Sequence, residues 1–139
     1  MVSNLIESWL SDMGIDPTRR DGSFMFATGS TAVVITPDDE GENAFVNIEC
    51  PVLMEPRVGQ HLMKELLKRN ARLKLGAFAL EDGCVTLSYT MPAAQGASGH
   101  FAEALRLLVK AADSADDELQ AMFGGRRVAD GRAAASKKA

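Results

Sequence analysis

The sequence predicts an α+β fold: a five-stranded antiparallel sheet with three helices, in the order α-β-β-β-α-β-β-α. Three segments place apolar residues at helical spacing, and five others have the apolar runs or alternation typical of strands. Short turn signals join neighbouring strands, as in antiparallel hairpins. Helices and strands do not alternate with glycine-rich crossings, which argues against a doubly wound parallel sheet.

Composition indicates one soluble globular domain over residues 1–125 and a basic tail over residues 126–139 that we expect to be disordered. The 139 residues are 46% hydrophobic, and no apolar run approaches the ~18 residues of a membrane span. The N-terminus lacks the form of a signal peptide, so we expect a cytoplasmic location. Residues 126–139 hold five basic side chains and one acidic side chain, a net charge of +4. Because the whole chain has a net charge of −4, residues 1–125 carry a net charge of −8.

The first helix and first two strands are predicted in the N-terminal third of the chain. One apolar face predicts a helix from Ser3 to Met13, ended by Gly14. The polar residues 16–23 are predicted to form a turn. Strands follow at 24–27 and 31–36, and the second is apolar on both faces, as in a central strand.

The third strand is predicted over residues 44–52, where apolar and polar residues alternate, so we expect one face of this strand to be exposed to solvent. Pro51 and Pro56 are expected to close it. The acidic segment 37–43 precedes this strand. It lacks the ligand spacing of a calcium loop, so we interpret it as an exposed turn.

A second helix is predicted over residues 58–71, with Lys and Arg on its outer face and in its last turn. Its apolar positions are expected to form one buried stripe, which consists of Val58, Leu62, Met63, Leu66 and Leu67.

A hairpin and a long helix complete the predicted fold. Strands at 73–80 and 84–91 flank Glu81-Asp82-Gly83, and Asp-Gly is a strong hairpin signal. A helix from Ser98 to Phe123 would span ~39 Å. Because that is long for a small domain, we expect part of it to reach another subunit.

No motif for catalysis or metal binding is present, so we expect no enzyme, no metal and no cofactor. His61 and His100 have no ligand at metal-binding spacing. Cys50 and Cys84 lie in predicted strands and are expected to be free, buried thiols rather than a disulfide. One catalytic hypothesis stays open, in which a polar pocket brings a histidine to a carboxylate from a distant segment.

Basic residues suggest a nucleic-acid surface at the corner after the second helix and in the tail. The alternative is a solvated corner and a solubilising tail, since stacking aromatics are missing and the body is acidic. The candidate residues are Lys68, Arg69, Arg72, Lys74, Arg126 and Arg127.

The stretch from Leu66 resembles a known family. It reads LLKRNARLKLGAFALEDGCVTLSYTMP and continues into the long helix with its Ala-Asp step. A helix ending in Asn, a strand, an acidic-Gly turn, a strand ending at Pro and a long helix are similar to the YbjN family, which shares the fold of CesT-class type III secretion chaperones. With the N-terminal half in matching order, the resemblance covers about residues 3–123.

The resemblance implies a non-enzymatic domain that forms a homodimer and binds another protein, with no catalytic residues. Secretion chaperones wrap an extended client segment over apolar surface, and YbjN-like members are linked to stress and regulatory roles. The alternative function is an accessory role in nucleic-acid metabolism or stress response through the basic corner and tail. Candidate protein-binding residues, each of which could instead belong to the core, are Phe45, Leu53, Met54, Met63, Met91 and Met122.

Overall fold

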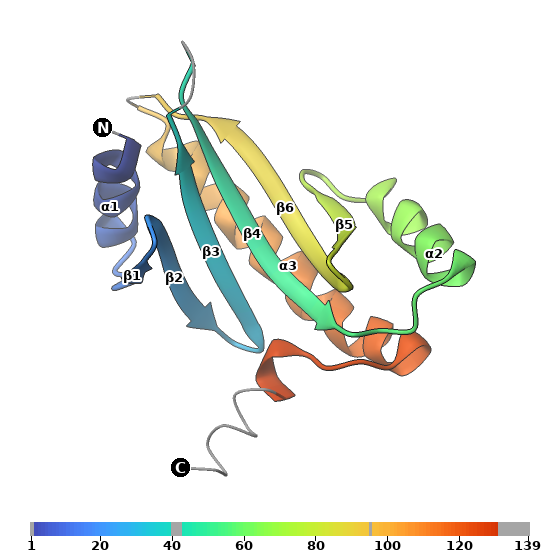
Figure 1. Cartoon of the computed structure of the whole chain (residues 1–139). Helices are drawn as coiled ribbons and strands as arrows, with labels where there is room; N and C mark the ends of the chain where they lie inside the picture. The colour runs from blue at the N-terminus through green and yellow to red at the C-terminus, as the bar shows by residue number, and fades with distance from the viewer. Residues whose placement is uncertain (1, 40–42, 95, 131–139) are drawn as a thin grey trace, which may run out of the picture.

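A computed structural model describes residues 2–39, 43–94 and 96–130. Within them the chain forms one antiparallel sheet of six strands in the order β1-β2-β3-β4-β6-β5 (Figure 1). The strands are β1 Thr18–Arg20, β2 Ser23–Thr28, β3 Thr31–Asp38, β4 Phe45–Met54, β5 Ala77–Glu81 and β6 Cys84–Pro92. The helices are α1 Val2–Asp12, α2 Gln60–Asn70 and α3 Ser98–Phe123. No helix in these ranges is long and apolar enough to cross a bilayer.

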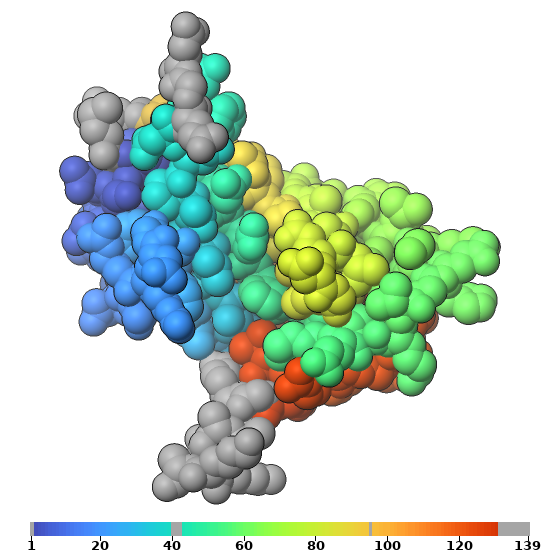
Figure 2. Space-filling view, in the orientation of Figure 1, coloured from blue at the N-terminus to red at the C-terminus, as the bar shows by residue number. Residues whose placement is uncertain are grey.

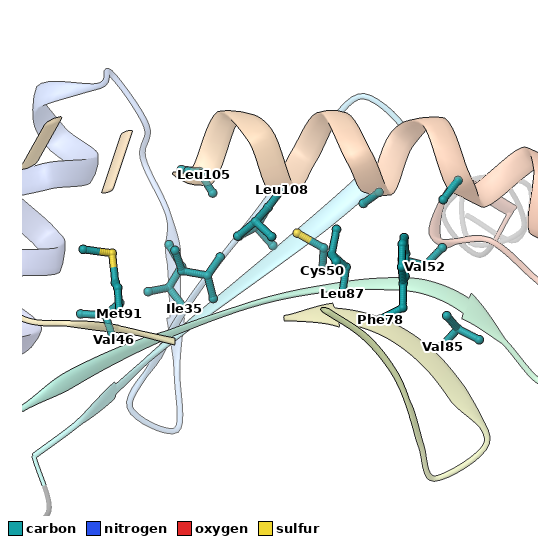
Figure 3. Close-up of a cluster of buried hydrophobic side chains, with 14 of the residues drawn as sticks. Ile35, Val46, Cys50, Val52, Phe78, Val85, Leu87, Met91, Leu105 and Leu108 are labelled. Carbon is teal, nitrogen blue, oxygen red and sulfur yellow. The ribbon is translucent and has the colours of Figure 1, made fainter. Parts of the chain in front are cut away.

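The core lies between the sheet and α3. Figure 3 shows side chains of β3, β4 and β6, among them Ile35, Cys50 and Leu87, pointing toward Leu105 and Leu108 of α3. The C-terminal half of α3 is also buried in its own domain, through Ala115, Leu119 and Phe123. The apolar face of α3 therefore needs no second subunit to bury it, and contact of α3 with another subunit stays a prediction.

The sheet has one strand more than predicted. Residues 18–20 form β1, which pairs with β2 through a tight turn at Asp21 and Gly22, both at positive φ (51° and 82°). The sequence shows no strand pattern there because all three residues of β1 are exposed, so apolar alternation is absent. Arg19 instead places its guanidinium 4.7 Å from the centre of the Phe24 ring.

The third predicted strand does not end at Pro51. β4 continues to Met54 because the register with β6 shifts between Pro51 and Leu53, and this bulge accommodates the proline. Val52 and Leu53 are consequently both buried. The acidic turn predicted before β4 is only partly covered: Pro37 and Asp38 belong to β3, and residues 40–42 lie outside the described residues.

The buried stripe predicted for the second helix is wrong at three of its five positions. Leu62 and Leu66 are buried, whereas Val58, Met63 and Leu67 are 54%, 51% and 70% exposed. The reason is that α2 lies at the β5 edge and buries only a narrow strip of its surface (Figure 1).

The strand predicted from residue 73 begins only at Ala77. Gly76, at φ +80°, lies where a Cβ would come within 2.8 Å of the Leu108 side chain and 3.0 Å of the Ser88 carbonyl oxygen. The chain therefore turns tightly against β6 and α3 before β5 can start.

The first residues of the predicted tail contact the domain. Arg126 pairs with Met54 as a short antiparallel bridge, with N–H to O distances of 2.7 and 2.8 Å. Gly125 makes this approach possible, because a Cβ there would lie 2.5 Å from the Met54 carbonyl oxygen. Residues 128–130 are helical, a fourth helical segment beyond the three predicted, and residues 131–139 lie outside the described part of the chain.

Candidate functional site

The two edges of the sheet differ in whether their backbone groups are covered. At the β5 edge, the Asn70 side chain of α2 accepts a hydrogen bond from the Phe78 N–H (2.6 Å) and donates one to the Phe78 carbonyl (3.1 Å). Phe78 pairs with Leu87 of β6 on its other side. Asn70 therefore covers the outer backbone groups that would otherwise template another strand.

The opposite edge is open over the second half of β2. β1 pairs only with Ser23, Phe24 and Met25, so residues 26–28 have no strand beside them on that side. Thr28 pairs with Thr31 across a two-residue turn, so the ladder alternation turns the N–H and C=O of Ala27 away from β3. Ala27 is exposed, and no protein group in the described ranges hydrogen-bonds this backbone.

A groove of about 590 Å³ lies beside this open edge, between β2, the segment after α1 (residues 13–16) and α3. We call it the edge groove. Phe26, Ile15 and Val109 contribute apolar surface to its wall. Its charged side chains balance, with Asp16 and Asp113 against Arg106 and Lys110. The full lining is Met13, Gly14, Ile15, Asp16, Phe26, Ala27, Thr28, Leu105, Arg106, Val109, Lys110 and Asp113.

The turn after β2 is held on α3 by two carboxylates. The Ser30 hydroxyl donates to Asp116 Oδ2 at 2.7 Å and also hydrogen-bonds Asp113, which accepts from the Ser30 N–H at 3.3 Å. Asp116 is only 3% exposed, and its Oδ1 has no protein partner in the described ranges. These contacts fix the end of β2 beside the edge groove.

A second groove follows the opposite side of α3, against α2 and the segment before β5. Its widest part encloses about 770 Å³ beside Val58, Leu62 and Met122, and two narrower parts continue it by shared lining residues. We call it the basic groove. Its charged or titratable residues are Arg57, His61, Lys64, Glu65, Lys68, Arg69, Arg72, Lys74, Lys110 and Glu118.

The six candidate protein-binding residues do not form one surface. Leu53 and Met91 are core residues, 0% and 1% exposed. Phe45 and Met54, at the two ends of β4, are partly buried. Met63 and Met122 are about half exposed, and only Met122 lines a groove, the basic one.

The candidate nucleic-acid residues divide into free and paired cations. Lys68, Arg72 and Lys74 line the basic groove, as does Arg69, which is held by Glu65 at 3.1 Å and Glu118 at 2.8 Å. Arg126 pairs with Glu55 at 3.0 Å.

Arg127 is also held within the domain, by Asp117 and Asp130. The hydrogen bonds that Arg127 donates to Asp130 raise the pKa of Arg127 and lower the pKa of Asp130. Three of the six candidates are therefore neutralised inside the domain.

Thiols and histidines form no reactive cluster. Both cysteines are free; burial raises the pKa of Cys50 to about 12 and also raises that of Cys84. His100 hydrogen-bonds the Tyr89 hydroxyl at 2.9 Å. His61 and Glu65 both line the basic groove, but the Glu65 carboxylate is held by Arg69. No group of His, Cys, Asp and Glu suited to a metal occurs in the described residues.

The sequence did not identify the edge groove. Its lining comes from the segment after α1, from β2 and from the middle of α3, three segments that only the fold brings together. One local signal existed, Phe26 as an apolar residue on a short strand before a Thr-Gly-Ser turn, but it equally fits a core position.

An open sheet edge beside an apolar groove is the arrangement of a peptide-binding domain. The chain belongs to the TY-Chap1 family, described as T3SS (YopN, CesT) and YbjN peptide-binding chaperone 1, whose profile matches residues 1–131. This confirms the resemblance found in the sequence. No curated protein sequence matches the chain.

Solved structures with the same fold include a chaperone of type III secretion. The ExsC–ExsE complex matches with a TM-score of 0.63 and 21% identity over 85% of this chain and 92% of that chain. The Yersinia pestis chaperone SycH, in complex with a stable fragment of YscM2, matches at 0.60 and 18% over 82% and 98%. YbjN from E. coli, described as a candidate transcription regulator, matches at 0.63 and 14% over 86% and 93%.

Proposed function

We propose that this protein is a non-enzymatic chaperone-like module that binds an extended segment of a partner protein along the open edge of β2. The single observation that carries the proposal is the exposed backbone of Ala27 beside the edge groove. Main-chain hydrogen bonds from an added strand would provide affinity, and the groove would accept its side chains. Family membership in a group of peptide-binding chaperones supports the same function.

The positions of Phe26 and Thr28 indicate which side chains of the bound segment would enter the edge groove. Phe26 and Thr28 both line the edge groove and flank Ala27. Residues directly opposite each other in neighbouring strands share a face of the sheet, so client residues opposite Phe26 and Thr28 would point into the groove. Because the charges around the groove balance, apolar side chains should be selected over charged ones there.

Selection from a phage-displayed peptide library tests the proposal. We expect the selected peptides to have apolar residues at alternate positions and to shift the amide resonance of Ala27. Ala27→Pro removes the outward N–H and should abolish binding, whereas the control Ala27→Ser keeps the N–H and should bind as the parent does. Peptides that bind equally well to Ala27→Pro, or leave the Ala27 amide unchanged, would contradict the proposal.

We also propose that the protein acts as a homodimer through the exposed apolar side of α2. Met63 and Leu67 lie one turn apart on this helix and are 51% and 70% exposed. The green helix α2 lies at the periphery of the molecule, where a second copy has access (Figure 2). The same patch on both copies would form the isologous contact that is commonest among homodimers.

Light scattering on the purified protein tests the homodimer. The parent should have twice the monomer mass, and the double variant Met63→Gln/Leu67→Gln should be monomeric, because the change removes most of the exposed apolar area. Gln60→Ala on the same helix is the control and should remain dimeric. A monomeric parent protein would exclude this part of the proposal.

A further inference from the structure

Positive charge is concentrated in the basic groove. Seven of the chain's fifteen Lys and Arg side chains line it, although acidic residues outnumber basic ones in the whole chain, nineteen to fifteen. Its two glutamates, Glu65 and Glu118, are both paired with Arg69. No ion pair within the described residues involves Lys64, Lys68, Arg72 or Lys110.

The same groove exposes apolar surface at its wide end. Val58 is 54% exposed and Met122 47%, above the buried side chains of Leu62 and Phe123. Arg57 fixes the wall, because its guanidinium donates to the Met122 carbonyl oxygen at 2.7 Å and its backbone N–H to that of Phe123 at 2.7 Å. An apolar floor with unpaired cations along its rim is therefore already formed in the free protein.

We propose that the basic groove is a second docking surface, which binds an acidic amphipathic segment of a partner protein. Apolar side chains of the segment would cover Val58 and Met122, and its carboxylates would face Lys64 and Lys68. Complementary charge accelerates and selects such encounters. The inference rests on the proposed function for the partner being a protein, but it concerns a different groove, which shares only Lys110 with the edge groove.

The lining favours a protein segment over a nucleic acid. Phe78 and Phe123 line the groove but are buried, 6% and 7% exposed, and His61 is an isolated exposed ring, so the groove has no series of exposed aromatic rings on which successive bases could stack. The apolar floor at Val58 and Met122 offers a phosphate backbone nothing to pair with, whereas apolar side chains of a peptide can cover it.

Fluorescence polarisation with a synthetic probe tests the proposal on the full chain. The probe is a fluorescein-labelled amphipathic peptide of Leu, Asp and Glu. Lys64→Glu/Lys68→Glu should weaken binding at least about tenfold. Arg19→Glu/Arg20→Glu, on the exposed strand β1, reverses the same amount of charge away from both grooves and should bind as the parent does. A probe with Leu replaced by Gln should bind at least about tenfold more weakly, because the apolar contact is lost.

Four results of the binding measurements would overturn the proposal, and a fifth comes from the variant Ala27→Pro. The four are no binding of the acidic probe by the parent, equal weakening by both charge-reversed variants, undiminished binding of the Gln probe, and tighter binding of a single-stranded DNA oligonucleotide that Lys64→Glu/Lys68→Glu abolishes. The variant Ala27→Pro shows which of the two grooves the acidic probe occupies. If it removes binding of the acidic probe, the probe occupies the edge groove, so the inference fails while the proposed function stands. Thermal unfolding confirms that each variant is folded.

Discussion

The two edges of the sheet differ in how neighbouring segments of the same chain cover their outer backbone groups. At β5, the preceding helix α2 covers the strand with one side chain: the Asn70 amide hydrogen-bonds both outer backbone groups of Phe78. At β2, the strand that precedes it is only three residues long, and the backbone of Ala27 has no such cover. A short neighbouring strand is enough to leave an edge open, and one asparagine is enough to close the other.

The largest effect should come from placing proline at matched positions on the two edges. Ala79 faces Thr86 in a hydrogen-bonded pair, so Ala79→Pro removes a ladder bond and should lower the free energy of unfolding by about 2 kcal/mol or more. Ala27→Pro loses no internal bond and should cost less than about 1 kcal/mol. Urea denaturation measures both. Similar losses for the two variants would show that the edges do not differ.

A smaller effect is expected from uncovering the β5 edge. Asn70→Ala removes both hydrogen bonds to Phe78 and should lower the free energy of unfolding by about 1–2 kcal/mol, with increased self-association at high concentration. Gln60→Ala, on the same helix and exposed, should change it by less than about 0.5 kcal/mol. Denaturation and light scattering check this pair, and equal stabilities would show that Asn70 does not protect the edge.

The smallest effect concerns the two thiols, one in the centre of the sheet and one next to the β5 edge. A thiol reacts as thiolate, so a raised pKa slows alkylation at any pH below it. Burial raises the pKa of Cys50 to about 12 and also raises that of Cys84, which is only partly buried. Iodoacetamide at pH 8 should label Cys84 first, and Asn70→Ala should accelerate labelling of Cys84 more than of Cys50. Mass spectrometry of tryptic peptides measures the order, and earlier labelling of Cys50 would contradict it.

The elements that sequence reasoning identified are those with strong local signals. Asp82 and Gly83 marked the β5–β6 turn, and the long apolar stripe of α3 gave its bounds. β1 was not predicted, because this exposed edge strand has no alternation of apolar and polar residues. The stripe of α2 was misjudged because helical periodicity shows which residues share a face, not how much of that face the domain will cover.

The candidate sites were harder to predict than the fold. Lys68, Arg69, Arg72 and Lys74 are close in sequence, so a basic corner was visible. Arg57 precedes α2 and Lys110 lies in α3, so only the fold brings them to the same groove. The high number of methionines suggested a binding surface, yet Met91 is buried in the core. Backbone availability at Ala27 depends on where a neighbouring strand stops, which no residue type encodes.

The length of α3 sets a distance that a binding partner has to respect. Val109 in the edge groove and Met122 in the basic groove are about 13 residues apart on one rigid helix, or roughly 20 Å along its axis. An extended chain advances about 3.3 Å per residue, so a single client that filled the edge groove and also covered Met122 at the wide end of the basic groove would need a spacer of at least about six residues. The length of α3 would therefore set a minimum spacing between the two contacts, and tethering two weak segments at that interval would raise the effective concentration of the second.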